Sequence, residues 1–315
     1  MNKRKSLILI LATAFFSSLF PQIASASACS SVGYTIEYVN GVADTLDRAK
    51  ANRDALKRYV GTERNGQPIT VNLAYNAEHV GGVVDLVQAV SQALFNPISD
   101  YNLHTILRQI AAEDTTRKLL IVGHSQGALY ANSIYDYITT HGEPHRAVDI
   151  YAVATPASYV AGGGKYGTSH DDAIVMGIRA LARKFDAPIP LPSNLIVKGG
   201  ATFPDLFATH QFGTYLKGGG EEMVYVMQEQ MDALVGTPSS ETSACFTPPD
   251  LTLTDRVQQG IFAVVDPPAN ATQTKVVQAY QAAIQGVTAT LGFVQWASSA
   301  IGSAHVAVEN VLSNP

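Results

Sequence analysis

A short apolar run at residues 118–123 (KLLIVG) is the feature that most constrains the fold. The run carries no charge after its first residue and ends in glycine, which is typical of a strand buried on both faces of a sheet. Residues 126–138 follow with helical spacing of their larger apolar side chains, at Leu129, Ile134 and Ile138. Because such a strand needs helices above and below it, we expect further strands and helices in alternation.

The chain up to residue 197 shows this alternation. Strand-like segments lie at residues 34–40, 69–75, 147–154 and 194–197. Helical spacing occurs at residues 44–59, 83–95, 103–112 and 173–185. Residues 156–167, rich in Gly, Ala and Tyr, are expected to form a flexible connection. The pattern predicts an α/β fold with a mainly parallel sheet, helices on both faces, and functional groups in loops at the carboxyl ends of the strands.

The first 28 residues have the organisation of a secretory signal peptide. Basic residues near the start precede an uncharged apolar run at residues 7–20, and residues 26–28 (Ala-Ser-Ala) fit the small-x-small cleavage pattern. We therefore expect residues 1–28 to be removed and the exported chain, periplasmic or secreted, to begin at Cys29. A retained membrane anchor is the less favoured alternative.

The cysteine content suggests a single disulfide. Cys29 and Cys245 are the two cysteines of the chain, and in an oxidising compartment such a pair is most simply joined. One alternative is a lipoprotein in which Cys29 is lipidated, although Ala26 stands where such proteins usually have Leu. The other alternative is two unrelated buried thiols.

The charge balance argues against a nucleic-acid partner. Without the three basic residues of the signal, 18 of the 21 Lys and Arg remain against 26 Asp and Glu, a net charge of about −8. An acidic surface repels phosphate backbones.

The end of the chain has a different composition from the rest. Residues 276–308 contain no Asp, Glu, Lys or Arg, and their apolar residues recur at helical spacing. Several glutamines in this stretch would each place an amide in hydrocarbon, which disfavours a membrane span. The pattern predicts a C-terminal helical extension at residues 246–315 that packs on the main domain. A lid-like or lipid-facing role is the alternative, and the sequence does not otherwise indicate membrane contact.

Residues 123–127 read G-H-S-Q-G and lie between the apolar run and the helix that follows it. A sharp turn there would push the Ser125 hydroxyl above the sheet, and the flanking glycines remove side chains that would collide. The N-terminus of the following helix favours a developing anion. We therefore predict that Ser125 is a nucleophile. A plain glycine-rich turn is the alternative.

A serine hydroxyl needs a base within hydrogen-bond reach and an acid that orients the base. In α/β folds with this motif they follow in the chain order serine, acid, histidine. The histidines after the serine are His141, His145, His170, His210 and His305. The first two come too early, and the last lies in the uncharged tail. His210 follows the last strand-like segment and is the predicted base, with an exposed loop histidine as the alternative.

Two adjacent carboxylates, Asp171 and Asp172, are the candidates for the acid. They come just before the helical segment at residues 173–185 and after the strand that follows the serine. Adjacent side chains in an extended segment point to opposite sides, so only one of them should face His210. We predict Asp172 in this role, and the alternative role for Asp171 is that of an N-cap of the helix.

A tetrahedral intermediate also needs hydrogen-bond donors for its oxyanion. The backbone N–H after the nucleophile, that of Gln126, is one candidate, and a second should come from the loop after an early strand. Asn40-Gly41 occupies that place, and we predict the N–H of Val42 as the second donor. A plain turn at Asn40-Gly41 is the alternative.

With these residues in place, the sequence resembles the α/β-hydrolase superfamily, and in particular its bacterial lipase-like and esterase-like members, over residues 34–216. The resemblance is carried by Asn40-Gly41 after the early strand, G-H-S-x-G at Ser125, a D-x-[IV] pattern at Asp172, and His210 in the last loop. The D-x-[IV] pattern favours Asp172 over Asp171. Many lipases have His-Gly instead of Asn-Gly, and no lid sequence is recognised.

The resemblance implies a single α/β-hydrolase domain at residues 29–245 that cleaves a small-molecule or lipid carboxylic ester through an acyl-Ser125 intermediate. It implies no metal and no organic cofactor. An acyltransferase that uses the same residues is one alternative. A non-catalytic binding protein that keeps the fold is the other, with the uncharged tail as its contact surface.

Overall fold

The computed structural model describes residues 29–42, 44–76, 100–184, 186–198, 208–236 and 245–252, together with Asp255. The expected signal peptide at residues 1–28 and the expected helix at residues 83–95 lie outside the described residues. Nearly all of the expected C-terminal extension lies outside them as well. The signal peptide, the helix at residues 83–95 and the C-terminal extension therefore remain predictions from the sequence.

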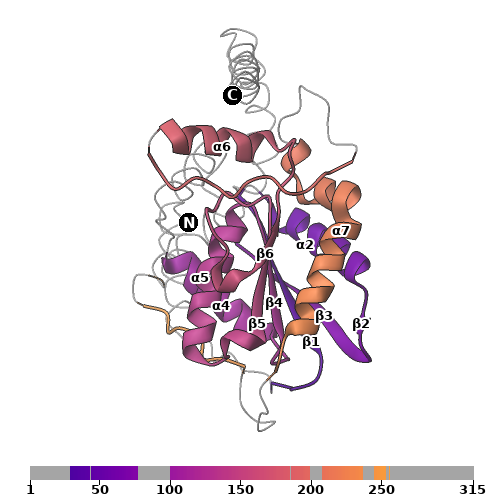
Figure 1. The fold of residues 1–315 in the computed structure, drawn as a ribbon. Coiled ribbons are helices and arrows are strands. Elements are labelled where there is room, and N and C mark those ends of the chain that lie inside the picture. Colours follow the sequence, from indigo (N-terminus) through magenta and orange to yellow (C-terminus); the bar gives the residue numbers. More distant parts are fainter. Residues whose placement is uncertain are drawn as a thin grey trace, which may run out of the picture.

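The centre of the described fold is a six-stranded sheet with the order β2-β3-β1-β4-β5-β6 (Figure 1). The strands are β1 (Tyr34–Val39), β2 (Glu63–Arg64), β3 (Gln67–Ala74), β4 (Leu119–His124), β5 (Val148–Val153) and β6 (Lys165–Gly167). Five of them run parallel, and β2 pairs antiparallel with β3 at one edge. The predicted α/β class with a mainly parallel sheet is confirmed.

The composition of β1 and β4 accounts for their position at the centre of the sheet. Every residue of β1 and of β4 is buried, as expected for strands that are covered on both faces. In their register Val39 lies beside Gly123, so both strands end at the same level. The loop after β1 and the turn after β4 are therefore neighbours at the carboxyl end of the sheet.

Among the described residues, five α-helices lie around the sheet: α2 (Leu46–Val60), α4 (Asp100–Glu113), α5 (Gln126–His141), α6 (Ala173–Lys184) and α7 (Phe212–Ala233). Short 3-10 helices are η1 (His145–Ala147), η2 (Ala161–Gly163) and η3 (Ala208–His210). Figure 1 shows α4 and α5 on one face of the sheet, α2 and α7 on the other, and α6 across one end. Separate clusters of buried apolar side chains fill the two faces, as the predicted layers require.

Three elements differ from the sequence-based expectations. Sequence patterns did not predict α7, because Gly218, Gly219 and Gly220 weaken any helical signal. In the structure these glycines permit close packing, since a Cβ on Gly218 would lie 2.4 Å from the Lys198 carbonyl oxygen. The expected flexible connection at residues 156–167 contains the edge strand β6. The expected strand at residues 194–197 is wrong, since that segment forms only an isolated bridge between Leu195 and Ser169.

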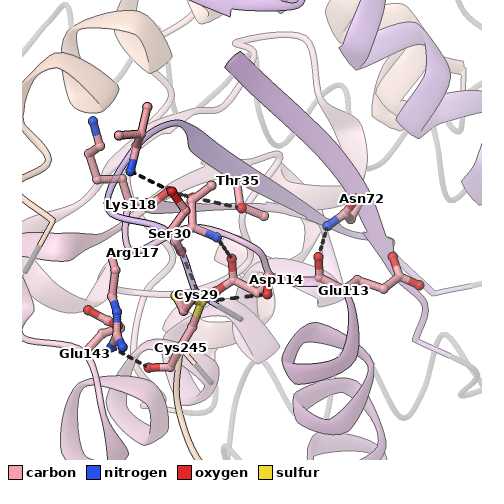
Figure 2. Close-up of a disulfide and its surroundings, with 12 residues drawn as sticks. Cys29, Ser30, Thr35, Asn72, Glu113, Asp114, Arg117, Lys118, Glu143 and Cys245 are labelled. Carbon is pink, nitrogen blue, oxygen red and sulfur yellow. Dashed lines mark hydrogen bonds and ion pairs between the residues drawn. A yellow bond between two sulfur atoms is a disulfide. The ribbon is translucent and has the colours of Figure 1, made fainter. Parts of the chain in front are cut away.

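Cys29 and Cys245 form a disulfide, as predicted, with their Cα atoms 5.0 Å apart (Figure 2). Ser30, next to Cys29, forms a bridge with Thr116, which lies just before β4 begins. The disulfide therefore lies at the amino end of the central strands and fastens the segment before β1 to the segment after α7. None of the helices in the described ranges has the length and apolar character that crossing a membrane requires.

Candidate functional site

The turn between β4 and α5 places Ser125 in a backbone conformation that L-residues rarely adopt, with φ 55° and ψ −121°. The neighbouring glycines allow it. A Cβ on Gly127 would lie 2.2 Å from the Val39 carbonyl oxygen, and one on Gly123 would lie 2.6 Å from the Gly127 carbonyl oxygen. Such strain costs about 1–3 kcal/mol and persists only where the surrounding packing enforces it. Here the close contact of α5 with β1 enforces it.

The structure brings Ser125, His210 and Asp172 together from three separate parts of the chain. The Nε2 atom of His210 lies 2.7 Å from the Ser125 Oγ atom. The Nδ1 atom of the same ring lies 2.8 Å from Oδ2 and 3.0 Å from Oδ1 of Asp172. This hydrogen-bond chain is the one that their predicted chemical roles need.

Asp172 is fully buried and well supplied with hydrogen bonds. Its Oδ1 atom accepts from the backbone N–H groups of Ile174 and Val175, both at 3.1 Å. Burial raises the pKa of this carboxyl, but the His210 charge and the hydrogen bonds outweigh it, so the pKa is lowered on balance. An ionised carboxylate is therefore favoured next to the imidazole.

The alternative role of Asp171 as the N-cap of α6 does not agree with the structure. The bonds to the first turn of α6 come from Asp172, the residue directly before the helix, while Asp171 is exposed. One carboxylate therefore caps α6 and contacts His210. The physical reason is its two oxygens, which accept hydrogen bonds in different directions.

Tyr215 is a site residue that sequence reasoning missed. Its hydroxyl donates to the Asp172 Oδ2 atom at 2.7 Å and accepts from the Ser169 backbone N–H at 2.9 Å. Burial, and then the charge of Asp172, raise the pKa of Tyr215 far above its usual range, so it remains a donor. Tyr215 lies in the first turn of α7. A sequence pattern that predicted this helix would also have placed Tyr215 next to His210.

His124, inside the G-H-S-Q-G segment, is a second residue that was missed. Its Nε2 atom lies 2.8 Å from the His210 backbone carbonyl oxygen, so it must carry the hydrogen and donate. Burial, and then the nearby His210 charge, lower the pKa of His124 to about 3, which keeps the ring neutral. The neutral ring anchors the backbone of His210.

The two predicted oxyanion donors flank Ser125. Gln126 directly follows Ser125 and is the first residue of α5. Gly41 abuts the serine, because a Cβ on Gly41 would lie 2.9 Å from the Ser125 Cβ atom. Val42 follows directly and is half-buried. The loop that carries the second predicted donor is therefore next to the predicted nucleophile.

Asp44 is a buried carboxyl in the same loop region. The Asn52 side chain donates to its Oδ2 atom at 3.2 Å, and the Arg48 guanidinium lies 3.9 Å from its Oδ1 atom. Burial raises the pKa of Asp44 to about 6, although the charges of Arg48 and His210 act against this increase. Asp44 is thus a second buried carboxyl in this region, with a pKa that burial raises.

Within the ranges that the structure describes, no group of three or more His, Cys, Asp and Glu side chains is arranged to hold a metal ion. The polar side chains at the site contact one another instead. Independence from metals and organic cofactors stays a prediction.

No model of a known protein family matches the chain, and a search of curated proteins likewise finds no match. The site must therefore be interpreted from its geometry. A hydroxyl hydrogen-bonded to an imidazole, which is held by a buried carboxylate, can act as a nucleophile toward a carbonyl group. This arrangement occurs on unrelated folds and is recognised by geometry and not by sequence position.

Proposed function

We propose that the protein is an α/β-hydrolase that cleaves carboxylic esters through an acyl-Ser125 intermediate. The observation that carries the proposal is the hydrogen-bond chain from the Ser125 Oγ atom through the His210 ring to Asp172, at 2.7 and 2.8 Å. Serine alone is a weak nucleophile at neutral pH, and this chain supplies the base that it lacks.

In the proposed reaction, His210 Nε2 takes the proton of Ser125 as the Oγ atom attacks the ester carbonyl. Asp172 keeps the Nδ1–H hydrogen in place and stabilises the imidazolium. The backbone N–H groups of Gln126 and Val42 bind the oxyanion. His210 then gives the proton to the leaving alcohol, and a water molecule releases the acid by the same steps.

The strand–turn–helix arrangement at Ser125 supports the finer fold assignment. A strained serine between a central parallel strand and a helix, followed along the chain by the acid and then by the histidine, is the order found in α/β-hydrolases.

We also propose that the protein is exported. The disulfide between Cys29 and Cys245 suits an oxidising compartment, and the expected signal peptide ends just before Cys29. The sulfur atom that lipidation would need is occupied in this disulfide, which favours the non-lipidated form. The mass of the mature protein distinguishes the two forms.

Labelling with a fluorophosphonate tests the function. We expect one adduct, mapped by peptide mass to Ser125, and its loss in Ser125→Ala. Ser193→Ala, a half-buried serine outside the site, is the matched control and should label like the wild type. A panel of p-nitrophenyl esters then defines the acyl chain.

The alternatives give different results in the same experiment. Absence of an adduct on folded protein would overturn the proposal in favour of a non-catalytic binding protein. Ester products that form when an alcohol acceptor is added would identify an acyltransferase with the same nucleophile.

A further inference from the structure

Three buried carboxamides form a continuous network beside Ser125. Asn40, Asn76 and Gln126 are each at most 1% exposed. They belong to the ends of three adjacent parts of the sheet: the loop after β1, the segment after β3, and the first residue of α5. Because β1 pairs with both β3 and β4, these ends meet at one level.

Asn40 controls the orientation of one peptide group. Its Nδ2 atom donates to the carbonyl oxygen of Gly41 at 3.0 Å. That carbonyl and the N–H of Val42 belong to the same peptide unit, which is trans, as is every peptide bond described in the chain. In a trans peptide the N–H points opposite to the C=O. The bond from Asn40 therefore holds the carbonyl toward the buried carboxamide and turns the Val42 N–H away from it.

Asn76 joins this peptide group to the turn at Ser125. Its backbone N–H donates to Asn40 Oδ1 at 2.8 Å, and its backbone carbonyl accepts from Asn40 Nδ2 at 3.1 Å. Its side-chain Nδ2 atom donates to the Gln126 Oε1 atom at 2.8 Å. The residues that carry the two proposed oxyanion donors, Val42 and Gln126, are thus connected through two asparagines.

We propose that Asn40 and Asn76 are positioning residues that hold the peptide N–H groups of Val42 and Gln126 in a fixed relation for oxyanion binding. This inference rests on the proposed function. In this role each asparagine acts through the backbone amide that it positions. A fixed pair of donors requires no rearrangement when negative charge develops, which is the main source of stabilisation in such sites.

The test measures hydrolysis of p-nitrophenyl butyrate and inhibition by a trifluoromethyl ketone. The inhibitor forms a tetrahedral oxyanion adduct and reports the donors directly. For Asn40→Ala we expect kcat to fall by roughly 10- to 100-fold, less than or equal to the loss of a whole donor. The inhibition constant of the ketone should rise by the same factor, with KM changed less than about threefold, since ground-state binding does not use these donors.

Asn132→Ala is the matched control. Asn132 is also a buried asparagine that accepts from a backbone N–H, that of Ala161 at 2.9 Å, and donates to a backbone carbonyl, that of Tyr159 at 3.2 Å. It holds a different loop, after β5. We expect Asn132→Ala to lower the melting temperature without the parallel change in kcat and ketone inhibition.

A double-mutant cycle tests the connection to Gln126 and remains usable if Asn40→Ala does not fold. Asn76→Ala and Gln126→Ala each remove one side of the hydrogen bond between the two side chains and leave the Gln126 backbone N–H in place. If the bond serves positioning, each variant should lower kcat, and the double variant should be no worse than the more damaging single one.

The outcomes separate the two proposals. No labelling and no turnover by the wild type would reject the proposed function and this inference with it. An active wild type with kcat and ketone inhibition unchanged in folded Asn40→Ala or Asn76→Ala would reject only the inference. So would an equal loss in Asn132→Ala, or a shifted pH profile in the variants, because that would indicate a general disturbance of His210.

Discussion

At the scale of single residues, the site is held by buried side chains that fix one another and the neighbouring backbone. Asp172 caps α6 through Oδ1 and accepts from Tyr215 through Oδ2, and both of its oxygens contact the His210 ring. His124 fixes the His210 backbone while Asp172 fixes its ring. A residue of this kind has little freedom to move, so small changes in its partners are expected to reach the Ser125–His210 hydrogen bond.

Tyr215→Phe removes one donor from Asp172 and leaves the ring in the core. We expect kcat for ester hydrolysis to fall by about 5- to 20-fold, corresponding to part of the roughly 1.5–3 kcal/mol of a hydrogen bond to a charged group. Tyr135→Phe is the control, because the Tyr135 hydroxyl also has a hydrogen bond, to His145, but away from the site. An unchanged kcat in Tyr215→Phe would mean that the remaining donors suffice.

Asp114, close to the disulfide in Figure 2, predicts a dependence of stability on pH. Burial raises its pKa from 3.8 to about 7, although a hydrogen bond from Thr116 opposes this. A carboxyl with a raised pKa in the folded state stabilises most when protonated, so its contribution is complete below about pH 4 and is lost as the pH rises to 7.

The measurement that checks this prediction is the free energy of unfolding in urea, for the wild type and for Asp114→Asn, at pH 5 and at pH 8. The wild type should lose stability relative to the variant by up to about 3 kcal/mol between these pH values, since one pKa unit corresponds to about 1.4 kcal/mol. Asp54→Asn, an exposed carboxyl on α2, is the control. A difference that does not change with pH would contradict the prediction.

At the scale of elements, the contact between β1 and α5 creates the turn at Ser125. Helix α5 approaches so closely that Gly127 lies against the Val39 carbonyl, and this approach is possible only without a side chain. The same contact brings Gly41 against Ser125. The packing of α5 against β1 therefore brings the predicted nucleophile and the predicted oxyanion loop next to each other.

Two glycine-to-alanine variants test this packing. In Gly127→Ala the new Cβ would lie 2.2 Å from backbone, so we expect α5 to shift, with a loss of stability of about 3 kcal/mol or more and loss of labelling at Ser125. Gly177→Ala on α6 meets nothing within 4 Å and should stabilise by about 0.5–1 kcal/mol through helix propensity. Equal effects of the two changes in urea unfolding would refute the argument.

At the scale of the whole molecule, the two ends of the central strands carry different groups of residues. The carboxyl end carries Ser125 and His210, while the amino end carries the disulfide and buried charges such as the Arg117–Glu143 ion pair. Cys29 and Cys245 are separated by 216 residues, so their bond restricts most of the unfolded chain. The disulfide and the Ser125–His210 hydrogen bond thereby lie at opposite ends of the sheet.

Cys29→Ala combined with Cys245→Ala should lower the free energy of unfolding by up to about 5 kcal/mol, from the loss of loop closure in the unfolded chain. Because the disulfide is remote from Ser125, kcat at low temperature should stay within about twofold of the wild type. Reduction of the wild type with dithiothreitol should reproduce the effect on stability. A large loss of kcat in the folded double variant would show that the two ends of the central strands are coupled.

Local patterns in the sequence determined the alternation of strands and helices, the glycine-flanked serine and the pairing of the two cysteines. The burial of a strand and the sterics of a turn depend on residues that are near one another in the sequence, so local patterns were enough to predict them. The pairing of the cysteines was predictable because the chain has only two of them. Only tertiary structure decided that β6 pairs at the edge, that Gly218–Gly220 form part of α7, and that Asp172 and not Asp171 caps α6. It also revealed Tyr215, His124 and the Asn40–Asn76–Gln126 network. These features consist of contacts between segments far apart in the chain, and such contacts exist only once the sheet has brought the strand ends together.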